Sequence, residues 1–251
     1  MSFSWPSYNE LAWTEELLAD PAEYEYEAGF YVDLIMRTAR DDPPRTLLHL
    51  GSGAGIHDRV FKRHFTVTGV DLSPGMLKKA RFDNPDVQYF QGDMRSIRLD
   101  RKFDAVAIPD STDYLVTRKD LHQAVKTAAE HLRKGGVFLV TAKPKETFQN
   151  NNFAYTGEKN GLHLTLLENN YINPYRPDTY EAVFVYLIRE QGELTIHTDH
   201  HILGLFPKWA WEQAFRDAGM DMQETLLDGV YERYILDGGS YPLTVFAGKK
   251  K

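Results

Sequence analysis

Leu47-Leu48-His49-Leu50-Gly51-Ser52-Gly53-Ala54-Gly55 is an apolar run that passes into a glycine-rich turn, and residues 56–64 then have the pattern of a helix. Glycine adopts backbone angles that other residues resist and lets a ligand approach the main chain closely. The spacing is G-x-G-x-G, whereas a dinucleotide fingerprint would need a glycine where this chain has Ile56. No G-x-x-x-x-G-K-S/T occurs, so the sequence lacks the phosphate-binding loop of nucleotide hydrolases.

Short apolar runs alternate with helical patterns around this turn, as far as residue 145. We expect strands at 46–50, 67–70, 87–90, 103–108 and 137–141, and helices at 56–64, 74–81 and 118–133. The apolar stripe of the last helix consists of Leu121, Val125, Ala128 and Leu132. Gly135-Gly136 is expected to end this helix. Strands that alternate with helices of this length predict a parallel sheet with helices on both faces.

The pattern changes near residue 161, where longer stretches of alternating polarity predict a small antiparallel sheet. They cover 162–169, 179–189 and 193–206. Pro207 is expected to open a helix that runs to Ala218, and two strands near 222–227 and 242–247 complete the chain. Residues 7–20 and 22–40 are predicted helices. The sequence predicts one domain over 1–251, divided into a helical cap (1–44), a core (45–145), an antiparallel insert (161–206) and a closing helix with strands (207–251).

The composition excludes several classes of chemistry. The chain has 251 residues, and 29 Lys and Arg against 36 Asp and Glu give a net charge of −7, which disfavours binding to nucleic-acid phosphates. Cysteine is absent, which excludes disulfides, thiolate nucleophiles, zinc ribbons and iron–sulfur clusters. No apolar run is long enough for a membrane helix, and residues 1–10 lack the basic and apolar pattern of a leader. We therefore expect a cytoplasmic protein with neither nucleic acid nor a membrane as its partner.

Two carboxylates follow later strands as the glycine turn follows the first. Asp71 ends the second expected strand in G-V-D-L-S, and Asp93 follows the third in Q-G-D-M-R. A carboxylate in the first of these places can accept both hydroxyls of a ribose. Alone, Asp71 is equally explained as a helix cap and Asp93 as a turn residue. Together with the turn they form three sites on one rim of the sheet, where open α/β sheets bind ligands.

The ordered motifs resemble those of class I S-adenosylmethionine-dependent methyltransferases, across nearly the whole chain. The matching stretches are the glycine turn, G-V-D-L-S-P-G-M-L, Q-G-D-M-R and F-D-A-V-A-I-P-D. The resemblance implies an α/β, Rossmann-like fold: a seven-stranded, mostly parallel sheet with helices on both faces, an N-terminal helical cap and a small antiparallel insert. It also implies an enzyme of class EC 2.1.1.- that uses S-adenosylmethionine as its cofactor.

The same resemblance implies roles for individual residues. The backbone at Gly51 to Gly55 would support the methionine portion, Asp71 would hold the ribose hydroxyls, and Asp93 would accept from the adenine amino group. Leu72 and Met76 would flank the adenine, and main chain near Pro109 would face the sulfonium. The full set of implied cofactor-binding residues is Tyr24, Gly51, Ser52, Gly53, Gly55, Asp71, Leu72, Met76, Gly92, Asp93, Met94 and Pro109.

One position departs from the class. The class usually carries an acidic residue two positions before the first motif glycine, and this chain has His49 there. The departure concerns the contacts behind the methionine amino group rather than the fold.

A narrower set of stretches is similar to amino-sugar N,N-dimethyltransferases of antibiotic biosynthesis. These stretches are 21–28, G-I-H at 55–57, Q-G-D-M-R, S-T-D-Y-L at 111–115 and D-H-H-I-L-G-L-F at 199–206. The similarity implies that Tyr24 lies in a cap over the cofactor and that Tyr114 faces the acceptor amine. The stretch 228–234 departs from that group because it lacks its glycine-rich ending.

Tyr114 follows the fourth expected strand, on the rim where the methyl group should emerge, together with Asp110 and Asp113. We predict that it orients the acceptor or relays its proton, against the alternative of a plain surface-loop tyrosine. His201 should share one face of a strand with His197 and Asp199. Neighbours on one strand face lie roughly 7 Å apart, which makes convergence on one metal ion difficult, so we predict no metal site. His201 is either a general base lining the acceptor pocket or a core histidine.

The predicted function is direct, in-line transfer of a methyl group to a small-molecule acceptor, an amine nitrogen before oxygen or carbon. The alternatives are an O-methyltransferase, a non-catalytic S-adenosylmethionine-binding or scaffold subunit, and an NAD-dependent oxidoreductase, which Ile56 disfavours. The protein is expected to be a monomer or a homodimer. Many of its aromatic residues fall in the cap and the insert, where their rings could attract a sulfonium cation.

Overall fold

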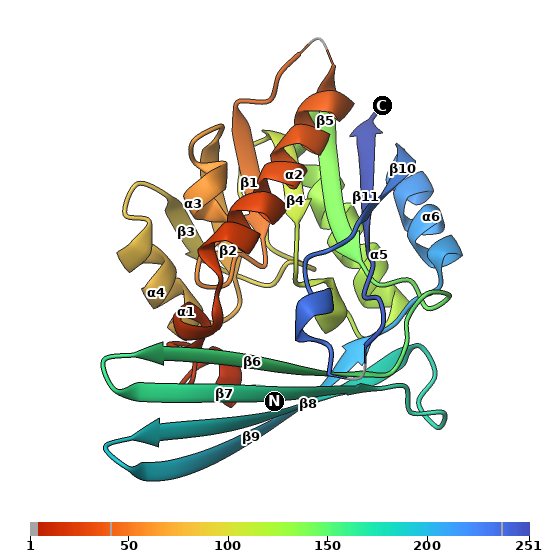
Figure 1. The fold of residues 1–251 in the computed structure, drawn as a ribbon. Helices are drawn as coiled ribbons and strands as arrows, with labels where there is room; N and C mark the ends of the chain where they lie inside the picture. Colours follow the sequence, from red (N-terminus) through yellow and green to blue (C-terminus); the bar gives the residue numbers. More distant parts are fainter. Residues whose placement is uncertain (1–4, 41, 237) are drawn as a thin grey trace.

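A computed structural model describes residues 5–40, 42–236 and 238–251 and shows two sheets (Figure 1). The larger has seven strands in the order β10-β11-β5-β4-β1-β2-β3. Their bounds are β1 Thr46–Leu50, β2 Thr66–Asp71, β3 Gln88–Gln91, β4 Phe103–Ile108, β5 Leu132–Ala142, β10 Met220–Leu227 and β11 Leu243–Lys250. Strands β1 to β5 pair in parallel, and β11 is antiparallel to both of its neighbours. The predicted mostly parallel sheet is confirmed.

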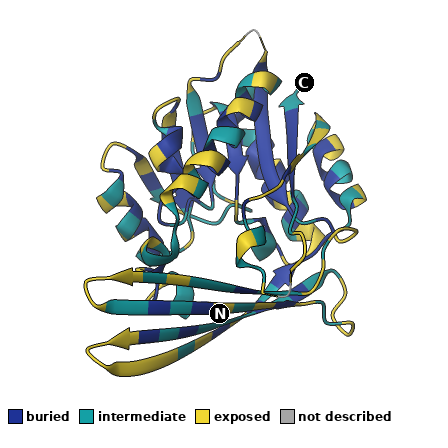
Figure 2. Cartoon of the chain, in the orientation of Figure 1, coloured by how far each residue is buried: buried dark blue, intermediate teal, exposed yellow. Residues whose placement is uncertain are grey.

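Helices cover both faces of this sheet, as expected from the alternating pattern. Their bounds are α2 Pro21–Ala39, α3 Asp58–Phe61, α4 Pro74–Asp83, α5 Arg118–His131 and α6 Lys208–Asp217. Side chains of α2, α3 and α4 pack in one core with Leu47, whereas α5 and α6 pack in the other with Leu48. Successive residues of β1 therefore enter opposite cores. Figure 2 shows the central strands buried along their length.

The second sheet is antiparallel, has the order β6-β7-β8-β9 and lies across the carboxyl ends of the parallel strands (Figure 1). Its strands are β6 Asn151–Lys159, β7 Leu162–Tyr171, β8 Thr179–Glu190 and β9 Glu193–Gly204. The insert therefore begins ten residues before the predicted start at 161, because β6 was missed. The sequence N-N-F-A-Y-T-G-E-K of β6 carries too few apolar residues to show the alternation that marks a half-buried strand.

Three helix predictions, 7–20, 56–64 and 118–133, were wrong in their extent, and of 56–64 only α3 at Asp58–Phe61 is helical. Residues 7–20 form only a short 3₁₀ turn η1 at Pro6–Tyr8 and a single turn α1 at Thr14–Leu18. The backbone of this stretch bonds elsewhere: Ser7 N donates to Asp199 Oδ2 at 3.0 Å, and Tyr8 O accepts from Ser73 Oγ at 2.7 Å. These contacts hold the segment between the two sheets and replace helical hydrogen bonds.

Helix α5 ends at His131, so Gly135-Gly136 does not terminate it as expected. Both glycines lie inside β5, at a shift in its register with β4. Gly135 has a φ of +78°, which lets the strand bulge there. Helix α6 begins at Lys208 with Pro207 as its N-cap. Among the described residues, no helix is long and apolar enough to cross a membrane.

Candidate active site

The glycine turn after β1 is fixed by hydrogen bonds to the neighbouring strand. The amides of Gly51 and Ser52 donate to Val70 O at 2.8 and 2.9 Å. Gly51 has a φ of +71°, and a Cβ there would collide with the side chain of Ser111, whose hydroxyl donates to Gly51 O at 2.9 Å. The side chain of Met94 reaches the same turn. Glycine is therefore required at position 51 by both backbone conformation and packing.

Gly53 differs from its neighbours because its environment is open. Its φ is +52°, and nothing lies within 4 Å of the place where a Cβ would stand. At Gly55, by contrast, a Cβ would lie 2.6 Å from Tyr89 Oη. The hydroxyl of Ser52 is buried and has no hydrogen-bond partner. The turn thus presents open main chain and an unpaired buried hydroxyl, which fits a polar ligand that approaches the backbone closely.

Asp71 ends β2 and closes the turn from the other side. Its Oδ2 accepts from Gly53 N and its Oδ1 from Ser73 N, both at 2.8 Å. Each carboxylate oxygen can accept a second hydrogen bond, which leaves one position on each for a ligand hydroxyl. Burial raises the pKa of Asp71. The geometry fits the predicted contact with two ribose hydroxyls.

Asp93 follows β3 but is already engaged. The guanidinium of Arg95 lies 2.6 Å from Asp93 Oδ2, and its Nε lies 2.9 Å from Oδ1. Burial would raise the pKa of Asp93, but the hydrogen bonds from Arg95 hold it below its usual value. Gly92 N donates to Asp71 O at 2.9 Å, so this loop is tied to the same rim. The contact of Asp93 with the adenine stays a prediction.

The remaining predicted cofactor residues are spread around the rim. Leu72 is 58% exposed and free to cover a flat ring, whereas Met76 is buried with Ala54 beneath the turn. Pro109 is buried at the end of β4. Tyr24 lies on α2 with its ring centroid 5.4 Å from that of His57. Their contacts with a cofactor also stay predictions.

His49 belongs to a closed buried network. Its Nδ1 lies 2.7 Å from Asp58 Oδ1, and Tyr89 Oη donates to Asp58 Oδ2 at 2.7 Å. His49 and Asp58 are almost completely buried. The place where the class usually has an acid therefore holds a histidine whose own partner is an acid nine residues later.

A second buried network lies beside it. Tyr31 Oη donates to Glu27 Oε1 at 2.6 Å, and His57 Nε2 lies 3.3 Å from Glu27 Oε2. Burial lowers the pKa of His57, but the charge and hydrogen bond of Glu27, together with the charges of Asp110 and Asp58, raise it overall. Glu27 and Asp58 were not identified from the sequence as members of the site. Glu27 lies in the 21–28 stretch, one helical turn before Tyr31, and side chains at this spacing on a helix can form a hydrogen bond.

Tyr114 and His201, 87 residues apart in the sequence, meet in the structure. Tyr114 Oη lies 3.2 Å from His201 Nδ1, and His201 Nε2 lies 3.0 Å from Asp199 Oδ2. The hydroxyl of Ser7 donates to the same oxygen of Asp199 at 2.7 Å. The hydroxyls of Tyr8 and Tyr114 are in contact as well. A chain of polar groups therefore runs from Asp199 through His201 to the two tyrosines.

This chain fixes the protonation states that the site can use. Burial lowers the pKa of His201 below its usual 6.5, so the imidazole is neutral at neutral pH. Burial also raises the pKa of Tyr114, which keeps its hydroxyl protonated. Asp199 Oδ2 lies 3.0 Å from Nε2 without hydrogen-bond geometry, and its negative charge favours a ring proton on that nitrogen, which leaves Nδ1 to accept from Tyr114.

Strand register confirms that His197, Asp199 and His201 share one face, since they pair with Tyr186, Phe184 and Ala182 of β8. The row through His201 continues across Ala182 to Asn170 and Asn151. No three His, Cys, Asp or Glu side chains in the described part of the chain are grouped to hold a metal ion. The face instead combines aromatic rings with amides and carboxylates.

A partly buried cation completes this side of the rim. Lys143 follows β5 and forms an ion pair with Asp113, whose Oδ2 also accepts from Tyr180 Oη at 2.8 Å. The Lys143 ammonium lies 5.5 Å from the ring centroid of Tyr241. Tyr114, one residue after Asp113, packs against Tyr180. The post-β4 loop is thus anchored to the second sheet.

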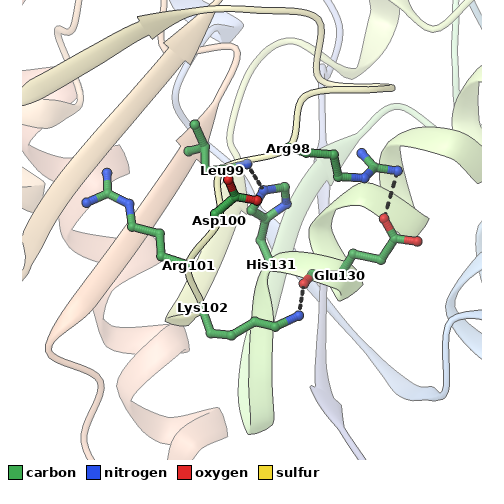
Figure 3. Close-up of a pocket in the computed structure, with 7 residues that line it drawn as sticks. All are labelled: Arg98, Leu99, Asp100, Arg101, Lys102, Glu130 and His131. Atoms are coloured by element: carbon green, nitrogen blue, oxygen red, sulfur yellow. Dashed lines mark hydrogen bonds and ion pairs between the residues drawn. The ribbon is translucent and has the colours of Figure 1, made fainter.

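A surface pocket lies elsewhere, at the opposite edge of the large sheet (Figure 3). Residues 98–102 line it before β4 begins, with Glu130 and His131 from the end of α5. Both ring nitrogens of His131 are used, by Leu99 N at 2.9 Å and by Thr127 O at 2.8 Å. The described residues that line this pocket pair with one another. They do not form a group of reactive side chains comparable to the one at the carboxyl ends of the parallel strands.

Comparisons with known proteins agree with this site. A methyltransferase-domain family matches residues 47–136. The chain is 32% identical over 207 residues to dTDP-3-amino-3,4,6-trideoxy-alpha-D-glucopyranose N,N-dimethyltransferase of Streptomyces venezuelae, covering 80% of this chain and 85% of that protein. It is 30% identical over 206 residues to dTDP-3-amino-3,6-dideoxy-alpha-D-glucopyranose N,N-dimethyltransferase of Streptomyces fradiae, covering 80% and 79%.

Two solved structures are similar over nearly their whole length. Streptomyces venezuelae DesVI has a TM-score of 0.78 at 28% identity, with 96% of both chains covered. SAM-bound CalS10, an amino pentose methyltransferase from Micromonospora echinaspora, has a TM-score of 0.75 at 25% identity, again with 96% of both chains covered.

The chain therefore belongs to the class I S-adenosylmethionine-dependent methyltransferases and, within that class, to the group of sugar N,N-dimethyltransferases. It is an enzyme, its cofactor is S-adenosylmethionine, and its acceptor is a small molecule. The alternatives of a scaffold subunit and an NAD-dependent oxidoreductase are set aside. The open backbone at Gly53, the unpaired Ser52 hydroxyl and the free positions on Asp71 fit this cofactor.

Proposed function

We propose that the enzyme methylates the amine nitrogen of an amino sugar. The relatives of Streptomyces venezuelae and Streptomyces fradiae are named for amino-sugar acceptors, which supports this class of substrate. The observation that carries the proposal is the chain Asp199–His201–Tyr114, which ends at the rim where β4 meets the second sheet. A neutral imidazole behind a tyrosine hydroxyl is suited to removing a proton from an acceptor nitrogen.

When bound, S-adenosylmethionine supplies a methyl group on a sulfonium, which is already activated for displacement. The chain's own task is to hold the acceptor in line and to take up its proton. An amine is nucleophilic only as the free base, so an ammonium acceptor must first lose a proton. Tyr114 Oη accepts that proton while passing its own to His201 Nδ1, and Asp199 stabilises the imidazolium that forms. The nitrogen–carbon bond forms as the carbon–sulfur bond breaks.

Aromatic rings surround the proton-accepting pair and keep water away from it. The ring centroids of Trp5 and Phe184 each lie 5.0 Å from that of His201, and the Trp5 centroid is also 5.0 Å from that of Tyr114. His201 itself is fully buried. Excluding water strengthens the electrostatic contacts in the site. The aromatic face of Trp5 is also suited to a cationic reacting centre.

Product analysis tests the proposed acceptor. The enzyme is incubated with S-adenosylmethionine and either a nucleotide-linked amino sugar or the same sugar with a hydroxyl in place of the amine. We expect N-methyl and then N,N-dimethyl product from the amine and none from the hydroxyl analogue. Methylation of the hydroxyl analogue alone would favour the O-methyltransferase alternative.

The cytoplasmic location and the monomeric or homodimeric state both stay predictions. Analytical ultracentrifugation would test the oligomeric state.

A further inference from the structure

The replacement of the class's acid by His49 raises the question of which group meets the ammonium of the cofactor's methionine portion. A cation held at the glycine turn requires an anionic partner, because burying an unpaired charge is costly. His49 cannot serve, since its Nδ1 is committed to Asp58 and the ring is 1% exposed. The partner must therefore come from another carboxylate near the turn.

Three carboxylates near the turn are already committed. Asp58 accepts from Tyr89 and contacts His49. Glu27 is held by Tyr31 and His57. Asp71 accepts from two backbone amides and is placed for the ribose hydroxyls. None of these has the free negative charge that an incoming ammonium needs.

Two further carboxylates lie at the same rim, that of Glu15, which is partly buried, and that of Asp110, which is exposed. Glu15 lies on α1, and its Oε2 is buried without a hydrogen-bond partner. Ala12, one turn earlier in the same segment, packs on Ala54 of the glycine turn, which brings Glu15 to this edge. Asp110 directly follows β4 and precedes Ser111, whose hydroxyl donates to Gly51 O.

We infer that Glu15 and Asp110 together supply the negative charge for the methionine ammonium, in place of the acid that the class carries at position 49. They lie on two different elements, one from the N-terminal cap and one from the core. The assignment concerns the cofactor alone and holds for any acceptor, so it goes beyond the proposed function.

The electrostatics of the two groups support this assignment. Burial, with the charge of Asp110, raises the pKa of Glu15 to about 7. Burial, with the charges of Glu27 and Asp113, raises the pKa of Asp110 to about 7 as well. The charged groups around Glu15 are Asp110, His57, Asp71 and Lys79, and those around Asp110 are Lys143, Glu27, Asp113 and His57. Both carboxyls therefore keep their protons to a higher pH than ordinary side chains do, and an arriving cation favours their ionised forms.

Proton release on cofactor binding provides the test. An ammonium placed between the two carboxyls lowers both pKa values, so protons leave the protein. Isothermal titration with S-adenosylhomocysteine at pH 7, in buffers of different ionisation enthalpy, should show release of about one proton per site. At pH 9 the release should be close to zero, because both groups are already ionised. The ligand 5′-methylthioadenosine, which lacks the methionine ammonium, should bind without this release.

Variants assign the release to residues. E15Q and D110N should each lose about half of it and bind S-adenosylhomocysteine about tenfold to a hundredfold more weakly. Their affinity for 5′-methylthioadenosine should not change, which a merely structural defect would alter. E16Q is the matched control, because Glu16 pairs with Lys79 and Lys159 at the surface and should leave the release unchanged.

The inference is overturned if S-adenosylhomocysteine binds the wild-type enzyme without releasing protons, or if release persists in the double variant. It is equally overturned if 5′-methylthioadenosine causes the same release. The comparison of the two ligands on the wild-type enzyme needs no variant, so poor folding of a variant leaves the test intact.

Discussion

At the scale of single residues, the contact between Tyr114 and His201 leads to the most specific prediction about catalysis. We predict that H201Q lowers kcat by about 10²- to 10⁴-fold, because the proton acceptor is lost, while affinity for S-adenosylhomocysteine is kept. H200Q is the matched control, since His200 lies on the opposite, exposed face of β9. Steady-state kinetics with both variants measures the difference. Equal turnover in H201Q and H200Q would contradict the assigned role.

The pH profile follows from the same contact. Burial lowers the pKa of His201 below 6.5. Well above this pKa the imidazole is neutral and can act as the base, and as the pH falls through the pKa the imidazole is protonated and the base is lost. We expect kcat/KM to be level around neutral pH and to fall about tenfold per pH unit on the acid side. In Y114F the proton relay through the Tyr114 hydroxyl is broken, but the His201 imidazole remains. An acid limb that persists unchanged in H201Q would assign the titration to another group.

His49 offers a second prediction at this scale. H49D restores the acid that the class usually carries, but it places a second carboxylate beside Asp58 in a fully buried site. We expect a loss of about 3–5 kcal/mol in the free energy of unfolding, measured with urea, because the buried pair is broken. We also expect no tighter binding of S-adenosylhomocysteine. A stable H49D enzyme that binds this ligand more tightly would return the ammonium contact to position 49.

At the scale of elements, the glycine turn separates folding from binding. G51A should cost at least about 2 kcal/mol of stability, because its φ is +71° and its Cβ meets Ser111. G53A should cost only about 1–2 kcal/mol, since its surroundings are open, but should weaken S-adenosylhomocysteine binding by about tenfold or more. Thermal melting and isothermal titration measure the two effects.

G161A is the control for this prediction. Gly161 also has a positive φ, +78°, with nothing within 4 Å of its Cβ position, but it lies in the β6–β7 hairpin away from the rim. It should match G53A in stability and leave binding unchanged. If G53A binds the ligand as well as G161A does, the open backbone is not the cofactor's support.

The packing of the N-terminal segment against the second sheet can be tested through its contribution to the free energy of unfolding. Leu11 is 3% exposed and packs with Leu164 and Leu166 of β7. L11A should lower the free energy of unfolding by about 2–5 kcal/mol through the cavity it leaves. L194A, at a 49% exposed position of β9, should stay within about 0.5 kcal/mol of the wild type. Urea unfolding of both variants compares them, and similar losses would contradict the packing of the segment.

At the scale of the whole molecule, the large sheet was predictable and the second sheet only partly so. The strands of the core are short apolar runs flanked by glycine and helix signals, so periodicity finds them. Strand β6 and the broken helix over 7–20 were not found, because tertiary contacts rather than local pattern fix them. Ser7 bonds to Asp199, and Phe153 of β6 is buried although two asparagines precede it.

The site divides in the same way. The glycine turn and Asp71 follow from motif order, because parallel strands end on one rim. That Tyr114 and His201 touch could not be predicted, since it depends on how the second sheet lies over the post-β4 loop. The buried, unpartnered Oε2 of Glu15 is likewise visible only in the structure.

The central claim is that the pair Tyr114–His201 removes a proton from an amine nitrogen during methyl transfer. The most direct measurement is NMR of the product from S-adenosylmethionine and a nucleotide-linked amino sugar, with wild-type and H201Q enzyme. We predict N-methyl and N,N-dimethyl sugar from the wild type and a rate lower by about 10²-fold or more from H201Q. Methylation on oxygen, or an N-methylation rate that H201Q leaves unchanged, would contradict the claim.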